Sequence, residues 1–154
     1  MTGNDVLEFA LKYSEHERPD IRHERPDIRA AIDDFAERNH FPEEETYKLQ
    51  LCLEEAILNI VKYGFHDADK HSIDIVLEFR GYTRSLAIRI LDDGAMFDSF
   101  GESDLHDFDS HLQSQSSGVL GLYLVRKYAD TACYRRQGDR NHLVLSKIIS
   151  RKPS

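Results

Sequence analysis

The sequence has few of the residues that hold small secreted proteins or membrane proteins together. It contains no tryptophan and only two cysteines, Cys52 and Cys133, which have no zinc-type spacing to histidine. Both thiols are therefore expected to be free and to serve as small core side chains in a reducing compartment. No apolar run approaches the roughly 20 residues that span a bilayer, and the first residues lack the pattern of a signal peptide. We expect a cytoplasmic protein without a membrane partner.

The chain also has fewer basic than acidic residues. The chain has 20 lysines and arginines against 28 aspartates and glutamates, a net charge of −8, which disfavours a direct nucleic-acid partner. Residues 92–117 contain no lysine or arginine, whereas residues 126–154 are basic and form either a solvated surface or a patch that binds phosphate or nucleic acid. The chain lacks the Gly-x-x-x-x-Gly-Lys-Ser/Thr motif, which excludes P-loop chemistry. Its eight histidines show no ligand spacing, so no histidine metal site is expected.

The length of the chain points to one domain. We expect residues 1–154 to form a single unit, because 154 residues leave little room for two. A domain of this size buries about two thirds of its unfolded surface, so it needs neither a disulfide nor a metal for stability.

One heptapeptide occurs twice in tandem. Residues 16–22 are repeated without change as residues 23–29, a unit too short for a solenoid repeat. The second copy leads into a segment with helical spacing, and Pro26 is expected to be the first helical residue. We expect the first copy to be an inserted loop or extra helical turns, left by a duplication rather than kept for function, and therefore dispensable.

Hydrophobic periodicity predicts elements in the order β, α, α, β, β, long loop, α, β, β. The strands alternate apolar and polar side chains and are expected at residues 6–13, 72–80, 84–91, 131–136 and 142–149. One helix is expected from residue 26, a second is opened by residues 41–45 and runs to about residue 63, and a third is expected at residues 120–128. The core stripe of the second helix comprises Leu49, Leu53, Ala56, Ile57, Ile60 and Gly64. Because strands outnumber helical crossovers, we predict an α/β two-layer sandwich with a mixed or antiparallel sheet and helices on one face.

The second predicted helix carries a carboxylate and an amide one turn apart. At about 100° per residue, Glu55 and Asn59 lie within about 40° of each other and roughly opposite the core stripe, pointing away from the main packing. A carboxylate and an amide oxygen so placed could serve as a general base and a metal ligand. Two polar residues on a solvated helix face are nevertheless ordinary, and the pair alone does not establish a site.

Two glycine-containing loops complete the set of candidate motifs. Asp92 and Gly94 directly follow an apolar strand, where they form either a turn or a place for a ligand to meet the carboxylate and the bare backbone. Residues 116–122 run from a polar loop into the start of a helix. That junction is either an anion site made by free N–H groups or an ordinary helix start capped by Ser117.

Taken in order, these motifs resemble the GHKL superfamily, which has the Bergerat ATP-binding fold. Residues 59–65 resemble its N box, residues 92–94 its first glycine box and residues 118–122 its second. The small size, the N-terminal strand and helix, and the Phe-Asp pair after the first glycine box are most similar to the anti-sigma-factor serine/threonine kinases of the RsbW type. The resemblance covers about residues 6–149, nearly the whole chain.

The resemblance implies a role for each matching residue. Glu55 would be the general base that activates the attacking hydroxyl, and Asn59 would hold Mg²⁺ at the phosphates of ATP. Asp92 would accept a hydrogen bond from the adenine amino group, with Gly94 beside the base. The backbone N–H groups implied at the phosphates belong to Gly118, Leu120 and Gly121.

The implied function is that of a kinase that sequesters a sigma factor and phosphorylates a serine of an anti-sigma-factor antagonist, with homodimerisation left open. The chain departs from the family pattern at Met96, at Tyr63 and at the pair 141–142, without an expected loss of ATP binding. A further departure is that the lid, expected at residues 98–117, contains no basic residue, although phosphoryl transfer requires charge to be neutralised on the moving group.

The alternative is a nucleotide-dependent regulatory binding module without kinase activity. A sensor histidine kinase core is disfavoured, because no dimerisation helix with a phospho-acceptor histidine precedes the predicted domain.

Overall fold

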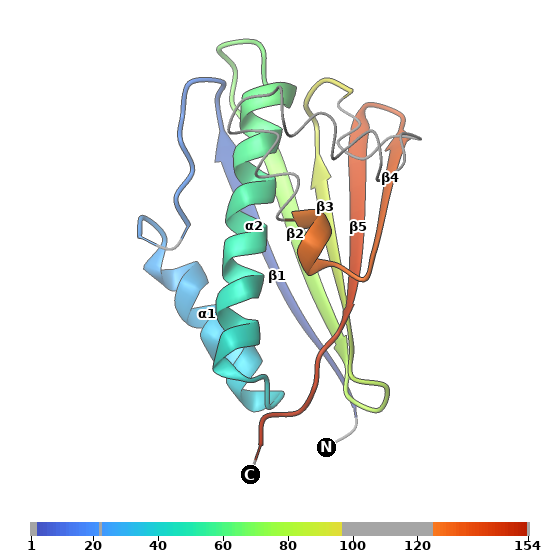
Figure 1. Cartoon of the computed structure of the whole chain (residues 1–154). Helices are drawn as coiled ribbons and strands as arrows, with labels where there is room; N and C mark the ends of the chain where they lie inside the picture. Colours follow the sequence, from blue (N-terminus) through green and yellow to red (C-terminus); the bar gives the residue numbers. More distant parts are fainter. Residues whose placement is uncertain (1–2, 22, 97–124, 154) are drawn as a thin grey trace.

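The computed structural model describes residues 3–21, 23–96 and 125–153 (Figure 1). In this part of the chain the strands are β1 (Asn4–Tyr13), β2 (His71–Arg80), β3 (Ser85–Asp92), β4 (Thr131–Gln137) and β5 (Arg140–Ile148). The long helices are α1 (Pro26–Arg38) and α2 (Glu43–Gly64), and residues 125–128 are also helical. The elements agree with the sequence-based ranges to within two residues wherever both ends are described.

The strands form a single sheet in the order β1-β2-β3-β5-β4, and every neighbouring pair is antiparallel. Both long helices cover one face of this sheet (Figure 1). The predicted two-layer α/β sandwich is therefore confirmed, and of the two sheet types left open by the sequence the antiparallel one is correct. No helix in the described part of the chain has the length and the unbroken apolar character that crossing a bilayer requires.

The core lies between the helices and the sheet. Each strand contributes alternate side chains to it, because successive residues of a strand face opposite sides. In β2 these are Ile73, Ile75, Leu77 and Phe79, all fully buried. The six residues of the stripe predicted on α2 are all buried as well. Burying each large aliphatic side chain stabilises the fold by about 1.5–3 kcal/mol, so the pattern of the sequence and the packing agree.

The two cysteines have different environments. Both are free, and Cys52 is buried on α2, where burial raises the pKa of its thiol to about 12. Cys133 is exposed on β4, so the expectation that it is a core residue was wrong. Alternation along β4, an edge strand, places Cys133 on the same face as exposed Thr131.

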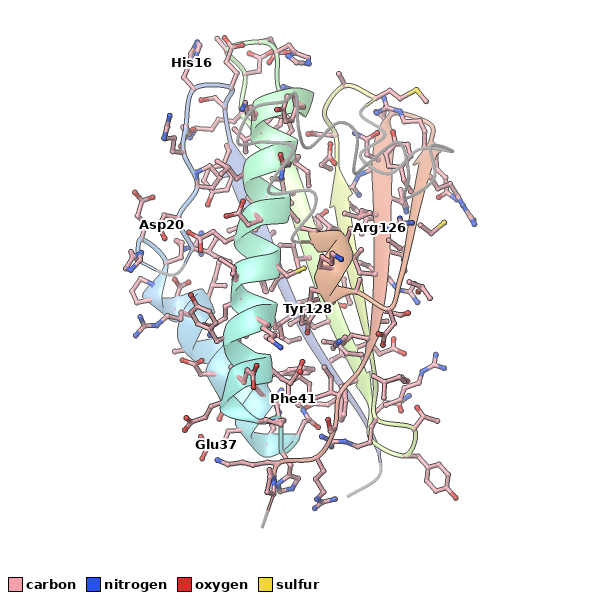
Figure 2. All side chains as sticks on the ribbon, viewed as in Figure 1. His16, Asp20, Glu37, Phe41, Arg126 and Tyr128 are labelled. Carbon is pink, nitrogen blue, oxygen red and sulfur yellow. The ribbon has the colours of Figure 1, made fainter. Side chains whose placement is uncertain are left out.

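The two heptapeptide copies have different conformations. Pro26 begins α1, as predicted, so the second copy enters the helix. In the first copy, residues 16–21 are non-helical and belong to the loop between β1 and α1, where Figure 2 labels His16 and Asp20. This loop nevertheless reaches the core: Ile21 is 2% exposed, and Ile28, its counterpart in the second copy, is 3% exposed. The sequence pattern did not indicate that the first copy packs into the core.

We expect Ile21→Ala and Ile28→Ala to destabilise the folded protein to about the same extent. Each substitution removes a buried aliphatic side chain and leaves a cavity, which lowers the free energy of unfolding by about 2–5 kcal/mol. Urea denaturation of the two variants measures this loss. The control is Ile148→Ala, the same substitution at a residue that is 59% exposed, with an expected change within about 0.5 kcal/mol. An Ile21→Ala protein as stable as wild type would show that the first copy is dispensable for packing.

Candidate functional site

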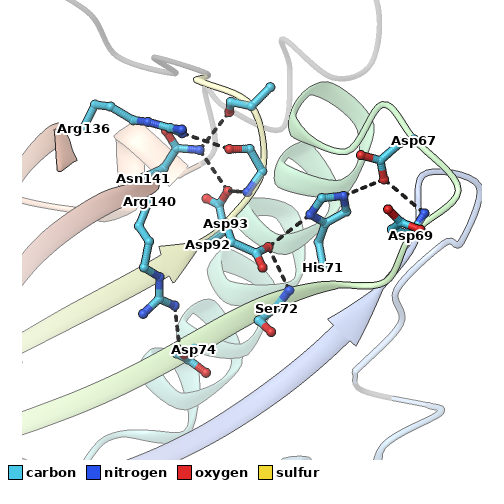
Figure 3. A network of polar contacts seen from close by, with 12 residues as sticks. Asp67, Asp69, His71, Ser72, Asp74, Asp92, Asp93, Arg136, Arg140 and Asn141 are labelled. Carbon is cyan, nitrogen blue, oxygen red and sulfur yellow. Dashed lines mark hydrogen bonds and ion pairs between the residues drawn. The ribbon is translucent and has the colours of Figure 1, made fainter. Parts of the chain in front are cut away.

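A buried carboxylate marks the end of the central strand β3. Asp92 is 4% exposed, and its Oδ1 accepts hydrogen bonds from the backbone N–H of Gly94 and from Nδ2 of Asn141, both at 2.9 Å (Figure 3). Burial raises the pKa of Asp92, and the two donors act in the opposite direction by stabilising the charged form. The chain thus holds an oriented carboxylate at the place where the sequence predicted a ligand-binding one.

The segment after β3 is pressed against the C-terminal end of α2. A Cβ added at Gly94 would lie 2.8 Å from the carbonyl oxygen of Gly64 and 2.8 Å from Cδ1 of Phe65, closer than real Cβ contacts. The N–H of Ala95 donates to the same carbonyl of Gly64 at 2.8 Å. Only glycine fits at position 94, because any side chain would push the two segments apart.

The same helix carries Glu55 and Asn59. Asn59 donates from Nδ2 to the backbone carbonyl of Glu55 at 2.9 Å, and its side chain is 2% exposed. The expectation that both residues point away from the packing was therefore wrong for Asn59, whereas Glu55 is half-buried. The amide of Asn59 bonds back to the preceding turn of its own helix, which keeps it inside the protein rather than on a solvated face.

The buried oxygen of Asn59 is the feature that fits a bound cation. In the described part of the chain, its Oδ1 is fully buried and has no hydrogen-bond donor. A buried polar atom without a partner costs about 1–3 kcal/mol, and an amide oxygen is a ligand that Mg²⁺ accepts. Asn59 therefore has the burial and the chemistry expected of the metal ligand predicted from the sequence.

The geometry of α2 relates these residues to Asp92. A Cβ added at Gly64, the last residue of α2, would lie 3.9 Å from Oδ1 of Asp92. At 1.5 Å per residue, Asn59 lies about 7–8 Å before Gly64 along the helix axis, and Glu55 about 13–14 Å before it. Along the helix axis, the order is therefore Gly64 beside Asp92, then Asn59, then Glu55.

The other predicted site residues cannot be placed in the same way. Gly118, Leu120 and Gly121 lie outside the described residues, and so does the whole of the predicted lid at residues 98–117. Their roles remain predictions.

Three residues of the β4–β5 hairpin lie next to Asp92 at the candidate site, and the sequence did not indicate them. They are Tyr134, Arg136 and Asn141. Asn141 is paired with Asp92 across β3 and β5, and its side chain is held by Tyr134 and Arg136 of β4. The sequence showed position 141 only as a departure from a family pattern. The register that places it beside Asp92 follows from strand pairing, which one sequence does not reveal.

A second polar cluster borders Asp92 on the side of β2. His71 lies between the carboxylates of Asp67 and Asp93, at 2.7 and 3.2 Å, and stacks on Phe65 with ring centroids 4.5 Å apart. Partial burial acts to lower the pKa of His71, but the two carboxylates outweigh it and the pKa is raised. The cluster anchors Phe65, whose ring touches the position of Gly94, and so supports the segment after β3.

The sequence also matches known proteins. Residues 18–147 match the family described as the histidine kinase-like ATPase domain. The serine/threonine-protein kinase BtrW of Bordetella bronchiseptica is 29% identical over 75% of this chain and 79% of its own length. The serine-protein kinase RsbW of Listeria monocytogenes is 28% identical over 79% of this chain and 78% of its own length.

A solved structure shows the same fold. The histidine kinase domain of a blue-light-activated histidine kinase from Erythrobacter litoralis superposes with a TM-score of 0.52, at 13% identity. The match covers 80% of this chain but 58% of that one, so the likeness concerns the fold alone. Such a domain implies ATP binding, and the resemblance to GHKL proteins of the RsbW type is confirmed. The chain belongs to the histidine kinase-like ATPase domain family.

Proposed function

We propose that the protein is a Mg-ATP-dependent serine/threonine kinase that acts as an anti-sigma factor. It sequesters a sigma factor and phosphorylates a serine of an anti-sigma-factor antagonist. The observation that carries the ATP part is the buried, oriented carboxylate of Asp92 against the end of the helix that bears Glu55 and Asn59. The protein part is supported by the names of the relatives, which are serine/threonine-protein and serine-protein kinases.

In this proposal, different residues bind the adenine and the phosphates of the nucleotide. Asp92 accepts a hydrogen bond from the amino group of adenine, and Gly94 lets the base lie against the backbone. Asn59 holds Mg²⁺ through its buried Oδ1, and the metal supplies charge neutralisation at the phosphates when it is bound. The backbone N–H groups of Gly118, Leu120 and Gly121, which lie outside the described residues, would bind the phosphate oxygens.

Glu55 performs the proton transfer. It takes the proton of the attacking serine hydroxyl as the serine oxygen forms a bond to the γ-phosphorus. The bond between that phosphorus and the bridging oxygen breaks, and ADP leaves with the electron pair. A positioned carboxylate in this role contributes about 10²–10⁴-fold to the rate.

The charge of the expected lid favours a second candidate function. Residues 98–117 contain no lysine or arginine to neutralise the transferring phosphoryl group. Arg136, a cation near the site, donates from Nη1 to the carbonyl of Gly94 at 2.8 Å and to Asn141 at 3.0 Å. In this structure the guanidinium of Arg136 therefore bonds residues at the end of the site proposed for adenine, not at the end proposed for the phosphates. If no partner supplies a cation, the protein is a nucleotide-dependent binding module without kinase activity.

A transfer assay with radiolabelled ATP separates the two functions. The purified protein is incubated with Mg-ATP and candidate antagonists, and serine phosphorylation is followed with time. Label that appears on an antagonist supports the kinase. Nucleotide-dependent binding of a partner without transfer supports the binding module.

Asp92→Asn tests the nucleotide site itself. At about 100 times Kd, Mg-ATP is expected to raise the free energy of unfolding of wild type by about 2.7 kcal/mol. The substitution replaces an acceptor with a donor facing the adenine amino group, so most of this gain is expected to be lost. Asp74→Asn is the control, because this carboxylate of β2 pairs with Arg140 instead. Urea unfolding with and without Mg-ATP measures both, and a wild type without any shift would refute the nucleotide site.

A further inference from the structure

The amide of Asn141 lies at the centre of a hydrogen-bonded network that spans three strands. Asn141 is 4% exposed, and its Nδ2 donates to Oδ1 of Asp92 at 2.9 Å and to the carbonyl of Ala95 at 2.8 Å. Its Oδ1 accepts from the hydroxyl of Tyr134 at 2.6 Å and from Nη1 of Arg136 at 3.0 Å. Figure 3 shows Asn141 between Asp92 and Arg136.

The surroundings of Asn141 allow only one orientation of its amide. The carboxylate of Asp92 and the carbonyl of Ala95 accept hydrogen bonds, whereas the guanidinium of Arg136 can only donate them. A flipped amide would place its oxygen against two acceptors and its NH₂ group against the guanidinium. The direction of the hydrogen bond to Asp92 is therefore determined by the network.

The two carboxylate oxygens of Asp92 differ in their hydrogen bonds. Both donors that reach the carboxylate from the described residues, Asn141 and the N–H of Gly94, bond Oδ1. Oδ2 receives no hydrogen bond from these residues. The orientation of the carboxylate is held by two contacts to Oδ1, one from β5 and one from the segment after β3. One oxygen anchors the side chain, and the other is left to meet a ligand.

We propose that Asn141 is a positioning residue for base recognition, which anchors Oδ1 of Asp92 so that Oδ2 faces the exocyclic amino group of an adenine nucleotide. The inference rests on the proposed binding of ATP at Asp92. Arg136 and Tyr134 hold Asn141 in turn, and Arg136 also bonds the carbonyl of Gly94, so the β4–β5 hairpin sets the geometry of the acceptor.

The test compares Mg-ATP with Mg-GTP by calorimetric titration. The two nucleotides share the triphosphate and the metal, so the ratio of their affinities isolates recognition of the base. Guanine presents a carbonyl oxygen where adenine has its amino group, and a fixed carboxylate oxygen rejects it. We expect wild type to prefer Mg-ATP and Asn141→Leu to lower that preference about 10- to 100-fold, through the loss of a charge-assisted hydrogen bond.

Asn141→Asp gives a readout that a merely structural residue would not produce. Its new carboxylate repels Asp92 at pH 8, so the preference for ATP is lost there. Near pH 5.5 one proton shared between the two carboxyl groups supplies a donor to Oδ1, and the preference returns at least in part. Among the described residues, the charged and titratable groups that also face this pair are Asp93, which bonds His71, and Arg136 and Tyr134, and all of them are the same in every variant. Asn141→Leu has no such proton and is not rescued at either pH.

Arg140→Met is the matched control on the same strand. Arg140 is the neighbour of Asn141 in β5, but its guanidinium pairs with Asp74 of β2 at 2.7 Å rather than with Asp92. This variant is expected to keep the wild-type ATP/GTP ratio at both pH values.

The outcomes separate the inference from the proposed function. If wild type does not bind Mg-ATP, the nucleotide site itself is wrong. If wild type binds Mg-ATP and both Asn141 variants keep its ATP/GTP ratio, Asn141 does not position Asp92. Should Asn141→Leu fail to fold, the pH dependence of the isosteric Asn141→Asp decides, and a ratio that is independent of pH overturns the inference.

Discussion

Glu55→Gln is expected to reduce phosphoryl transfer to a protein serine by about 10²–10⁴-fold while leaving the affinity for Mg-ATP near that of wild type. Glutamine keeps the size and the hydrogen-bonding capacity of the side chain but cannot take a proton from the attacking hydroxyl. Glu55 lies on α2 about 13–14 Å before Gly64, at the end of the helix path that is remote from Asp92. Removing the charge of Glu55 should therefore not disturb the adenine or the carboxylate of Asp92 that recognises it.

Single-turnover transfer and calorimetric binding, measured on the same preparation, separate these effects. Glu43→Gln is the control, because it makes the same change at an exposed residue of the same helix. Asn59→Ala provides the contrasting phenotype: it removes the buried oxygen proposed for Mg²⁺ and should weaken Mg-ATP binding itself. Transfer at the wild-type rate by Glu55→Gln would show that another group is the base.

The elements that the sequence predicted well are those whose signal is local. The strand alternation of β2 and the stripe along α2 depend on the periods of 2 and 3.6 residues, and every predicted stripe residue is buried. Pro26 begins α1 because its fixed φ and missing N–H suit the first helical position. The motif order identified the family for the same reason, since each box is a short segment with its own pattern.

The features that the sequence did not reveal depend on tertiary contacts. Two identical heptapeptides adopt different structures, because residues 16–21 lie in the loop before α1 whereas residues 26–29 form its first turn. Local sequence therefore cannot decide their conformation. Ile21 is buried because the loop folds back onto the core. Asn141 joins the site through the register of β3 and β5, and Asn59 is buried although helical geometry places it away from the core stripe.

Gly94 and Gly64 give the sharpest test of the close approach between the segment after β3 and the end of α2. Gly94→Ala would place a Cβ 2.8 Å from the backbone carbonyl of Gly64, an atom that cannot move without shifting the helix end. Gly64→Ala makes the same change on the other side of the contact, but its Cβ would meet its neighbours at 3.9 Å or more, an ordinary distance. The two substitutions are chemically identical and differ in the space available.

We expect Gly94→Ala to lower the free energy of unfolding by about 1–3 kcal/mol, the usual cost of overpacking. It should also weaken Mg-ATP binding by about tenfold or more, because the N–H of residue 94 anchors Oδ1 of Asp92 and moves with the displaced segment. Gly64→Ala should remain within about 1 kcal/mol of wild type, since alanine is the better helix former. Urea unfolding and calorimetric titration of both variants measure these differences. Equal behaviour of the two variants would mean that the segment after β3 does not depend on its contact with α2, and the geometry proposed for the adenine end of the site would then be wrong.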